Sequence, residues 1–370
     1  MKFEKRTYDA WLASAEMPYD ILIPLLHSMN GSAGIHSAWK NSDNPLFRLI
    51  PERCLRQMEK TADDDHLASF ESVMEQSRIQ SVTILEEEYP HRLREIPDPP
   101  GILFMIGNPE CLSRRKTAAM VGSRTATYDG LKASGKIAEE LSRSGVTIIS
   151  GLAYGIDAEC HRGCLKGGSP TIAVMGGGPE RTYPSKHEGL KKEILEHDGL
   201  ILSEYAPGTQ PVGYHFPVRN RIISGLAETV ILMEAKIRSG SMTTVGHALE
   251  QGKDVYVYPG DPSSPMTEGN RLLLREGALY FTEAKDILED LGWLDNLPII
   301  LQNSGCSSGS IPEDSSQKAV YLALERGSLG FDELMKATGM GSSALMSTLT
   351  IMQIRKIIEP LPGKRYQIIS

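Results

Sequence analysis

The residues best suited to chemistry lie in short glycine-containing turns that follow apolar runs. Gly122-Ser123-Arg124 follows one such run and offers backbone N–H groups, a hydroxyl and a guanidinium at a predicted strand-to-helix turn. These groups suit a phosphate, because a helix N-terminus and an arginine both favour negative charge. The turn lacks the lysine of a Walker A loop and does not form a full GxGxxG, so the sequence disfavours P-loop and dinucleotide sites.

Three further turns have the same character. They are rich in glycine or serine, and each follows an apolar run. Glycine permits close approach of a ligand to the backbone. The predicted phosphate-binding residues in these turns, with the lysine that follows the second, are Gly151, Gly176, Gly177, Gly178, Lys186, Ser239, Gly240 and Ser241.

Arg219, Asn220 and Arg221 stand at the beginning of a predicted helix. Positive charge there opposes the helix dipole, so we expect a bound phosphate to compensate it. Glu234, at the end of a later apolar run, could pair with one of these arginines and orient it. Asp157 is expected to cap its helix, with His161 one turn further on and close enough to contact it.

No hydrolytic device is evident in the sequence. HExxH is missing, and no GxSxG elbow stands at a predicted strand-to-helix turn, since the match at 305–309 lies in a serine-rich stretch; we therefore predict no catalytic residues. Cys160 and Cys164 lie near His161, but no second ligand cluster accompanies them. We therefore predict neither a metal nor a cofactor.

These turns must be positioned by a sheet. Between residues 117 and 260, short apolar runs alternate with stretches long enough for one helix each. This order predicts an α/β fold with a Rossmann-like, doubly wound, mostly parallel sheet. The carboxyl ends of its strands share one edge, where the turns would line a single crevice.

The chain divides by composition into four parts. Residues 1–78 read as short helices, and 79–296 hold the sheet domain. Residues 297–316 are rich in serine and predict a flexible linker. Residues 317–370 carry three helices and a hairpin, which is the pattern of a winged helix.

The bulk composition is that of an ordinary globular protein. Net charge is −8 in 370 residues, so a polyanion must bind at a local patch. The five cysteines predict no disulfide framework. No signal-peptide core or apolar run of membrane-spanning length is evident, so we expect a cytoplasmic protein without membrane contact.

The motifs together resemble the DprA (Smf) family of DNA-processing proteins. The resemblance rests on GSR, SGLAYGID, GGG with YP, FPVRNRIISGL, EA with SGS, and ALEQGKDVYVYPG. It implies a SAM-like N-terminal helical domain beside the Rossmann-like core and the winged helix. It also implies a homodimer that binds single-stranded DNA, protects incoming DNA during natural transformation (competence) and loads the RecA recombinase for DNA recombination. The family's DNA pocket maps onto Gly122, Ser123 and Arg124, onto the glycines from 176 to 178, and onto Arg219, Asn220 and Arg221, with Ser239, Gly240 and Ser241 on the same edge.

One alternative function remains open. An enzyme of the phosphoribohydrolase (lysine-decarboxylase-like) type would share such a sheet, although the stretch SGSMTTVGHALE lacks that family's PGGxGTxxE.

Within the DprA resemblance, Tyr154 stands where an arginine is frequent, which removes one cation from the expected pocket. The winged helix is expected to contact proteins mainly, because its third helix, residues 342–355, is poor in base-reading side chains.

Overall fold

The computed structural model describes residues 2–40, 44–294, 315–324, 327–354, 357–361 and 365–368. The chain forms two compact units, Met1–Asp295 and Asn296–Ser370, which are described separately. The predicted linker, 297–316, lies outside the described residues except for Ser315 and Ser316, with which α14 begins.

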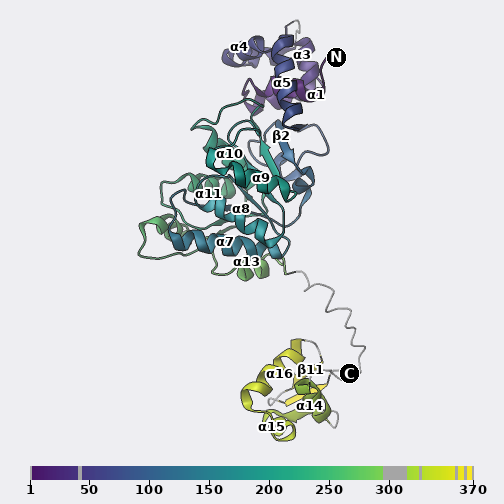
Figure 1. The fold of residues 1–370 in the computed structure, drawn as a ribbon, viewed down its shortest axis with the longest axis vertical. Coiled ribbons are helices and arrows are strands. Elements are labelled where there is room, and N and C mark those ends of the chain that lie inside the picture. The colour runs from purple at the N-terminus through teal and green to yellow at the C-terminus, as the bar shows by residue number, and fades with distance from the viewer. Residues whose placement is uncertain are drawn as a thin grey trace. The chain divides into compact units, whose positions relative to one another are not determined.

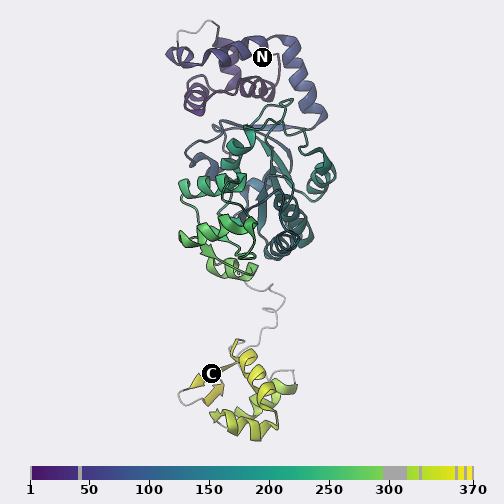
Figure 2. The same cartoon turned by 90° about the vertical axis from the view of Figure 1, so that its left-hand side faces the viewer.

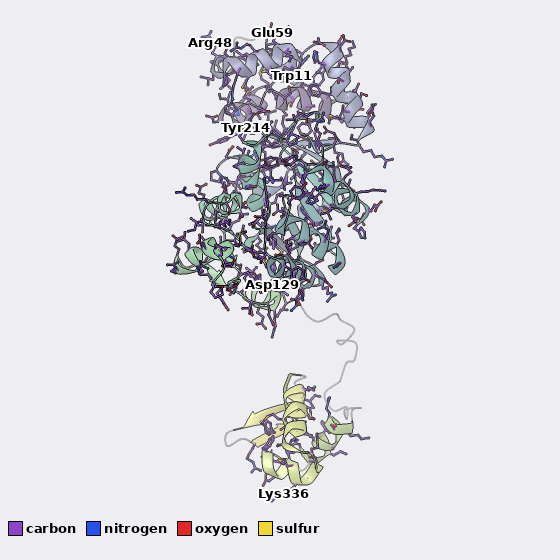
Figure 3. The ribbon with its side chains drawn as sticks, turned by 60° about the vertical axis from the view of Figure 1, so that its left-hand side comes forward. Trp11, Arg48, Glu59, Asp129, Tyr214 and Lys336 are labelled. Carbon is purple, nitrogen blue, oxygen red and sulfur yellow. The ribbon has the colours of Figure 1, made fainter. Side chains whose placement is uncertain are left out.

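The first unit begins with helices that enclose a core of their own. Trp11 is fully buried there, and its indole Nε1 donates to the carbonyl of Met58 at 3.0 Å. Figure 3 labels Trp11 within this helical layer. The apolar cluster continues into Ile102 and Phe104, so these helices pack against the edge of the sheet. The elements are α1 (Lys5–Ala13), α2 (Tyr19–Ser28), α3 (Ser32–Ala38), η1 (Pro45–Leu49), α4 (Glu52–Lys60) and α5 (Asp64–Gln76).

Within residues 44–294, the described strands form one nine-stranded sheet in the order β1-β2-β6-β5-β4-β3-β7-β8-β9. The pairs from β6 to β9 are parallel, while β1 and β2 form an antiparallel edge. The strands are β1 (Gln80–Thr83), β2 (Ile102–Gly107), β3 (Thr117–Val121), β4 (Thr147–Ser150), β5 (Thr171–Val174), β6 (Leu200–Ser203), β7 (Thr229–Leu232), β8 (Val255–Val257) and β9 (Leu279–Tyr280).

Helices cover both faces of this sheet, as the two views of the ribbon show (Figures 1 and 2). Successive side chains of a strand point to opposite faces, so Ala119 and Val121 pack under α10–α12, and Ala118 and Met120 under α7, α8 and α13. The elements are α6 (His91–Arg94), η2 (Pro109–Ser113), α7 (Tyr128–Arg143), α8 (Ile156–Gly167), η3 (Ser185–His187), α9 (Glu188–Glu196), α10 (His215–Leu226), α11 (Gly240–Glu250), η4 (Pro265–Thr267), α12 (Glu268–Arg275) and α13 (Ala284–Asp290).

The strand order reverses between β3 and β7, where the chain crosses from one half of the sheet to the other. The helices that follow the two strands then leave toward opposite faces, which opens a crevice at their carboxyl ends. The predicted α/β, Rossmann-like, mostly parallel sheet is confirmed. Its switch point lies where Gly122-Ser123-Arg124 follows β3.

The second unit is small and has its own apolar core, which includes Val320, Leu334, Leu345 and Leu349. Its strands form an antiparallel sheet in the order β10-β12-β11. The elements are α14 (Ser315–Leu324), β10 (Leu329–Gly330), α15 (Phe331–Thr338), α16 (Ser342–Ile354), β11 (Ile358–Leu361) and β12 (Arg365–Ile368).

Candidate functional site

A cavity of about 570 Å³ opens at the switch point of the sheet. Its volume is within the range of small-ligand sites. Its walls come from the turns after β3, β4 and β7 and from the beginning of α10. The residues that carry the argument below are Ser123, Arg124, Asp157, Tyr183, Phe216, Arg219, Asn220, Lys236, Arg238, Ser239, Gly240 and Ser241.

Three exposed cations surround this cavity. Arg124 follows β3, and Lys236 and Arg238 follow β7. The Arg124 guanidinium lies over the ring of Phe216 at 5.2 Å, a cation–π contact that holds it at the rim. Among the described residues that line the cavity, Asp157 is the one carboxylate. The rim is therefore positive, although the whole chain is acidic.

The N-terminus of α11 completes the wall between Lys236 and α10. Its N-cap residue, Ser239, makes no capping hydrogen bond through its side chain, and its hydroxyl lies 2.8 Å from that of Ser241. The Asn220 amide donates to the carbonyl of Gly240 at 3.1 Å and fixes this turn. The first N–H groups of a helix lack partners within the helix, so this end favours an anion.

Arg219 lines the floor of the cavity, but it is buried. Its Nη1 donates to the carbonyls of Gly151, at 3.1 Å, and Val174. Burial lowers the pKa of Arg219 to about 10, and the nearby Asp157 carboxylate opposes this shift. Asp157 accepts from the backbone N–H groups of Gly151 and Ala153, which precede α8, while the N-cap of α8 is Gly155; the expected helix cap at Asp157 is therefore wrong. Arg219 therefore holds the turn after β4 to α10.

Gly151 is required by this packing. A Cβ added there would lie 2.6 Å from Nη2 of Arg219 and 2.8 Å from Oδ2 of Asp157. Gly122 has a similar constraint, because its Cβ would lie 2.6 Å from Cγ1 of Ile156. At both positions the missing Cβ makes room for protein side chains, while Gly122 lines the main cavity and Gly151 a small cavity beside it, so their predicted contact with a phosphate stays a prediction.

Arg221 does not line this cavity, which corrects its predicted place beside Arg124 and Arg219. Its two terminal nitrogens each lie 2.7 Å from an oxygen of Glu204, and Nε lies 3.1 Å from Oδ2 of Asp98. These carboxylates raise the pKa of Arg221 despite its burial. Residues two apart on a helix face different directions, so Arg219 and Arg221 serve different sides of α10.

Gly176, Gly177 and Gly178 are also absent from the cavity wall. All three are buried. A Cβ on Gly176 would lie 3.0 Å from Cδ1 of Phe216, and one on Gly177 would lie 3.0 Å from the backbone of Thr209. The segment from 205 to 217 thus covers these glycines, and close packing explains them in place of a phosphate. Lys186 is exposed on η3 and is not part of the wall either.

Two predicted side-chain pairs are wrong. Glu234 contacts neither arginine: it accepts from Thr127 N at 2.9 Å and from Thr127 Oγ1 at 2.6 Å, beside the N-terminus of α7. His161 Nδ1 lies 2.7 Å from the hydroxyl of Thr171, and Asp157 accepts backbone N–H groups. In both cases the side chain contacts a threonine that the sequence did not indicate as its partner.

Lys236 and Arg238 are the two cations of the site that we did not predict. Both are exposed and stand directly before the α11 N-terminus, in the stretch AKIRSGS. Their position in the sequence, directly before a serine-glycine turn at the end of a predicted strand, could have indicated them as site residues.

The described residues hold no cluster of three metal-binding side chains. Among the described helices, none has the length and apolar character needed to span a bilayer.

A model of the DNA recombination-mediator protein A family matches residues 80–292. The DNA processing protein DprA of Streptococcus pneumoniae is 42% identical over 228 residues, which is 62% of this chain and 78% of the relative. Its X-ray structure aligns at 34% identity with a TM-score of 0.65, over 78% of this chain and 99% of that one.

A solved structure of DNA processing protein A from Helicobacter pylori, described as an insight into its unique single-stranded DNA binding mode, is 28% identical. It aligns with a TM-score of 0.52 over 58% of this chain and 97% of that chain. Residues 80–292, which the family model matches, contain the whole switch-point cavity, whose walls lie between 121 and 244. The chain therefore belongs to the DNA recombination-mediator protein A family, the family that its motifs resemble.

Proposed function

We propose that this chain is a DNA-processing protein that binds single-stranded DNA in the switch-point cavity. The observation that carries this proposal is the convergence of Arg124, Lys236 and Arg238 on one cavity beside the open N-terminus of α11. Exposed cations with backbone N–H groups bind a sugar-phosphate chain without regard to sequence. The relative from Helicobacter pylori, described by its single-stranded DNA binding mode, supports the same ligand for this chain.

Arg124→Glu tests the site directly. The substitution places a negative charge at the rim, and we expect at least about a tenfold loss of affinity for an oligonucleotide at low salt. Fluorescence anisotropy with a labelled single strand measures the affinity. Lys192→Glu is the matched control, because Lys192 is exposed on α9 and outside the cavity. Equal affinity of the Arg124→Glu variant and the wild type would contradict the site.

The same assay separates single-stranded from duplex DNA. A salt series with both ligands gives the number of phosphates contacted, since the slope of log affinity against log salt scales with that number. We expect the single strand to bind more tightly, because its bases are free to contact the protein.

We propose that the chain binds without catalysis. Asp157 is already a double acceptor of backbone N–H groups, which leaves it poorly placed to act as a base. Incubation with nucleoside monophosphates distinguishes the alternative, a phosphoribohydrolase. Release of free base would favour that enzyme, and strand binding without turnover would favour the binding protein.

We further propose, on the family membership, that the protein is a cytoplasmic homodimer that protects incoming DNA and loads a RecA recombinase during natural transformation. Light scattering after gel filtration tests the dimer. Formation of RecA filaments on a protected single strand, with and without this protein, tests loading.

We also propose that 1–78 is a SAM-like domain and 317–370 a winged helix that mainly contacts proteins. The three helices and antiparallel sheet of the second unit suit this architecture. On α16, Met346 and Ile351 are exposed, and neither can read base edges by hydrogen bonds. Salt-dependent loss of duplex binding on deleting this unit would contradict the proposed protein-contact role.

A further inference from the structure

The phosphate-binding rim is bordered by aromatic side chains. A small cavity of about 30 Å³ adjoins the main one, and its walls include Arg124, Tyr154, Tyr183 and Phe216. Arg124, Tyr183 and Phe216 line both cavities. A strand whose phosphate lies at Arg124 would therefore have these rings within reach of its bases. The small cavity is too narrow for a base, so stacking must use the outer faces of the rings.

Phe216 offers little free surface for stacking. Arg124 lies over its ring at 5.2 Å and Arg219 at 5.9 Å, while the ring of Tyr183 packs at 5.2 Å with an interplanar angle of 34°. The backbone of Gly176 also lies against its edge. Phe216 is half-buried by these neighbours and acts as the support of the rim.

Tyr183 and Tyr154 differ from Phe216 in their exposure. Tyr183 is 46% exposed and Tyr154 is 43% exposed. Each has one neighbouring ring that holds it: Phe216 behind Tyr183, and His187 edge-on to Tyr154 at 5.0 Å. An exposed ring that is already held in place loses little conformational freedom when it stacks on a ligand.

We propose that Tyr183 and Tyr154 stack on bases of the strand whose phosphates lie at Arg124, so that the site holds bases as well as backbone. This inference rests on the proposed single-strand binding and adds to it the part of the nucleotide that these rings recognise. Because every base has a π-face, the contact tolerates any sequence. At position 154 the chain thus uses stacking, which salt does not screen, in place of a cation.

The test combines protein variants with an altered ligand. Wild type, Tyr183→Leu, Tyr154→Leu and Tyr183→Phe are titrated by anisotropy with an oligothymidylate and with an abasic oligomer of the same length. We expect each leucine variant to bind the oligothymidylate about tenfold more weakly. Affinity for the abasic oligomer should be unchanged, and Tyr183→Phe should bind both ligands like the wild type.

Tyr19→Leu is the matched control, because Tyr19 is 40% exposed on α2 and lines neither cavity. The inference is overturned if the leucine variants lose affinity equally for both oligomers, which would indicate a structural role. It is also overturned if the wild type binds both oligomers equally, because bases then contribute nothing. Failure of the wild type to bind either oligomer would overturn the proposed function itself.

Discussion

Arg124 and Arg219 both lie over the ring of Phe216, but they differ in exposure and in hydrogen-bond partners, which gives them different roles. Arg124 is exposed, so its N–H groups can exchange water for a phosphate. Arg219 is 3% exposed and already donates to carbonyls of two turns. Removing the partners of a buried guanidinium costs folding free energy, so we assign Arg219 a structural role in the site. Arg124 is assigned the role of binding the ligand.

Arg219→Gln is expected to lower the free energy of unfolding by about 3 kcal/mol, because it leaves buried Asp157 without its cation. Arg124→Gln should leave stability unchanged and weaken strand binding. Urea denaturation measures the first quantity and anisotropy the second. If Arg219→Gln weakened binding while leaving the urea midpoint at the wild-type value, Arg219 would have to be reassigned to the ligand.

His161 makes stability depend on pH. Thr171 donates its hydroxyl proton to the Ile148 carbonyl, so Nδ1 of His161 must donate to Thr171, and Nε2 has no partner among the described residues. Burial lowers the pKa of His161 to about 3. The folded-state pKa is below the unfolded value near 6.5, so the unfolded chain takes up the proton first. The stability is fully present above that value and is lost as pH falls.

Between pH 7 and pH 5 we expect His161 to contribute a loss of about 2 kcal/mol to the free energy of unfolding. His161→Asn keeps a donor toward Thr171 but cannot titrate. The variant should therefore show a shallower fall of stability with acid, measured by urea denaturation at several pH values. Parallel profiles for variant and wild type would show that another group controls this range.

At the scale of elements, opposite sides of α10 contact different parts of the first unit. Arg219 and Asn220 face the switch-point cavity, while Arg221 forms an ion pair with Glu204 beside the N-terminal helices. Tyr214, just before α10, lies 3.5 Å from Glu16 of the helical layer (Figure 3). Contacts at the cavity and contacts near the N-terminal helices therefore both hold α10 in position.

The turn between β7 and α11 supplies two of the three rim cations. We expect the double variant Lys236→Ala, Arg238→Ala to reduce the salt slope of strand binding by about 1.4, since each phosphate contact on a single strand contributes roughly 0.7. Affinity measured from low to moderate salt gives the slope. An unchanged slope with a lower affinity would mean that these residues do not neutralise phosphates.

At the scale of the whole molecule, a chain of net charge −8 concentrates positive charge at one cavity. The overall field opposes a polyanion, so binding must come from short-range contacts, which salt screens over about 10 Å. All residues of the cavity wall lie between 121 and 244, in the first unit. The site should thus be complete without the second unit.

A chain truncated after Asp295 is expected to keep its strand affinity to within about twofold, because no second site tethers the ligand. Anisotropy on the full chain and on the truncated chain, each checked for its thermal transition, makes the comparison. A loss of tenfold or more would show that the second unit contacts the strand.

The sequence by itself determined the parallel sheet and the edge of it that carries the site, at the carboxyl ends of the strands. Apolar runs that end in glycine identify buried strands, and their alternation with helices makes the sheet parallel, so Arg124 and Ser239 to Ser241 had to share one crevice. These conclusions depend on local periodicity and on topology, which residue types reveal. The resemblance of the motifs to the DprA family indicated the same crevice.

Only the tertiary structure decided which of those residues face the ligand. Arg221 turns to Glu204, Glu234 to Thr127, and the glycines from 176 to 178 are covered by a segment about thirty residues later. Each outcome depends on which distant segment fills the adjacent space. The spacing of residues along the chain carries no information on that choice, because burial and partners arise only when the layers pack.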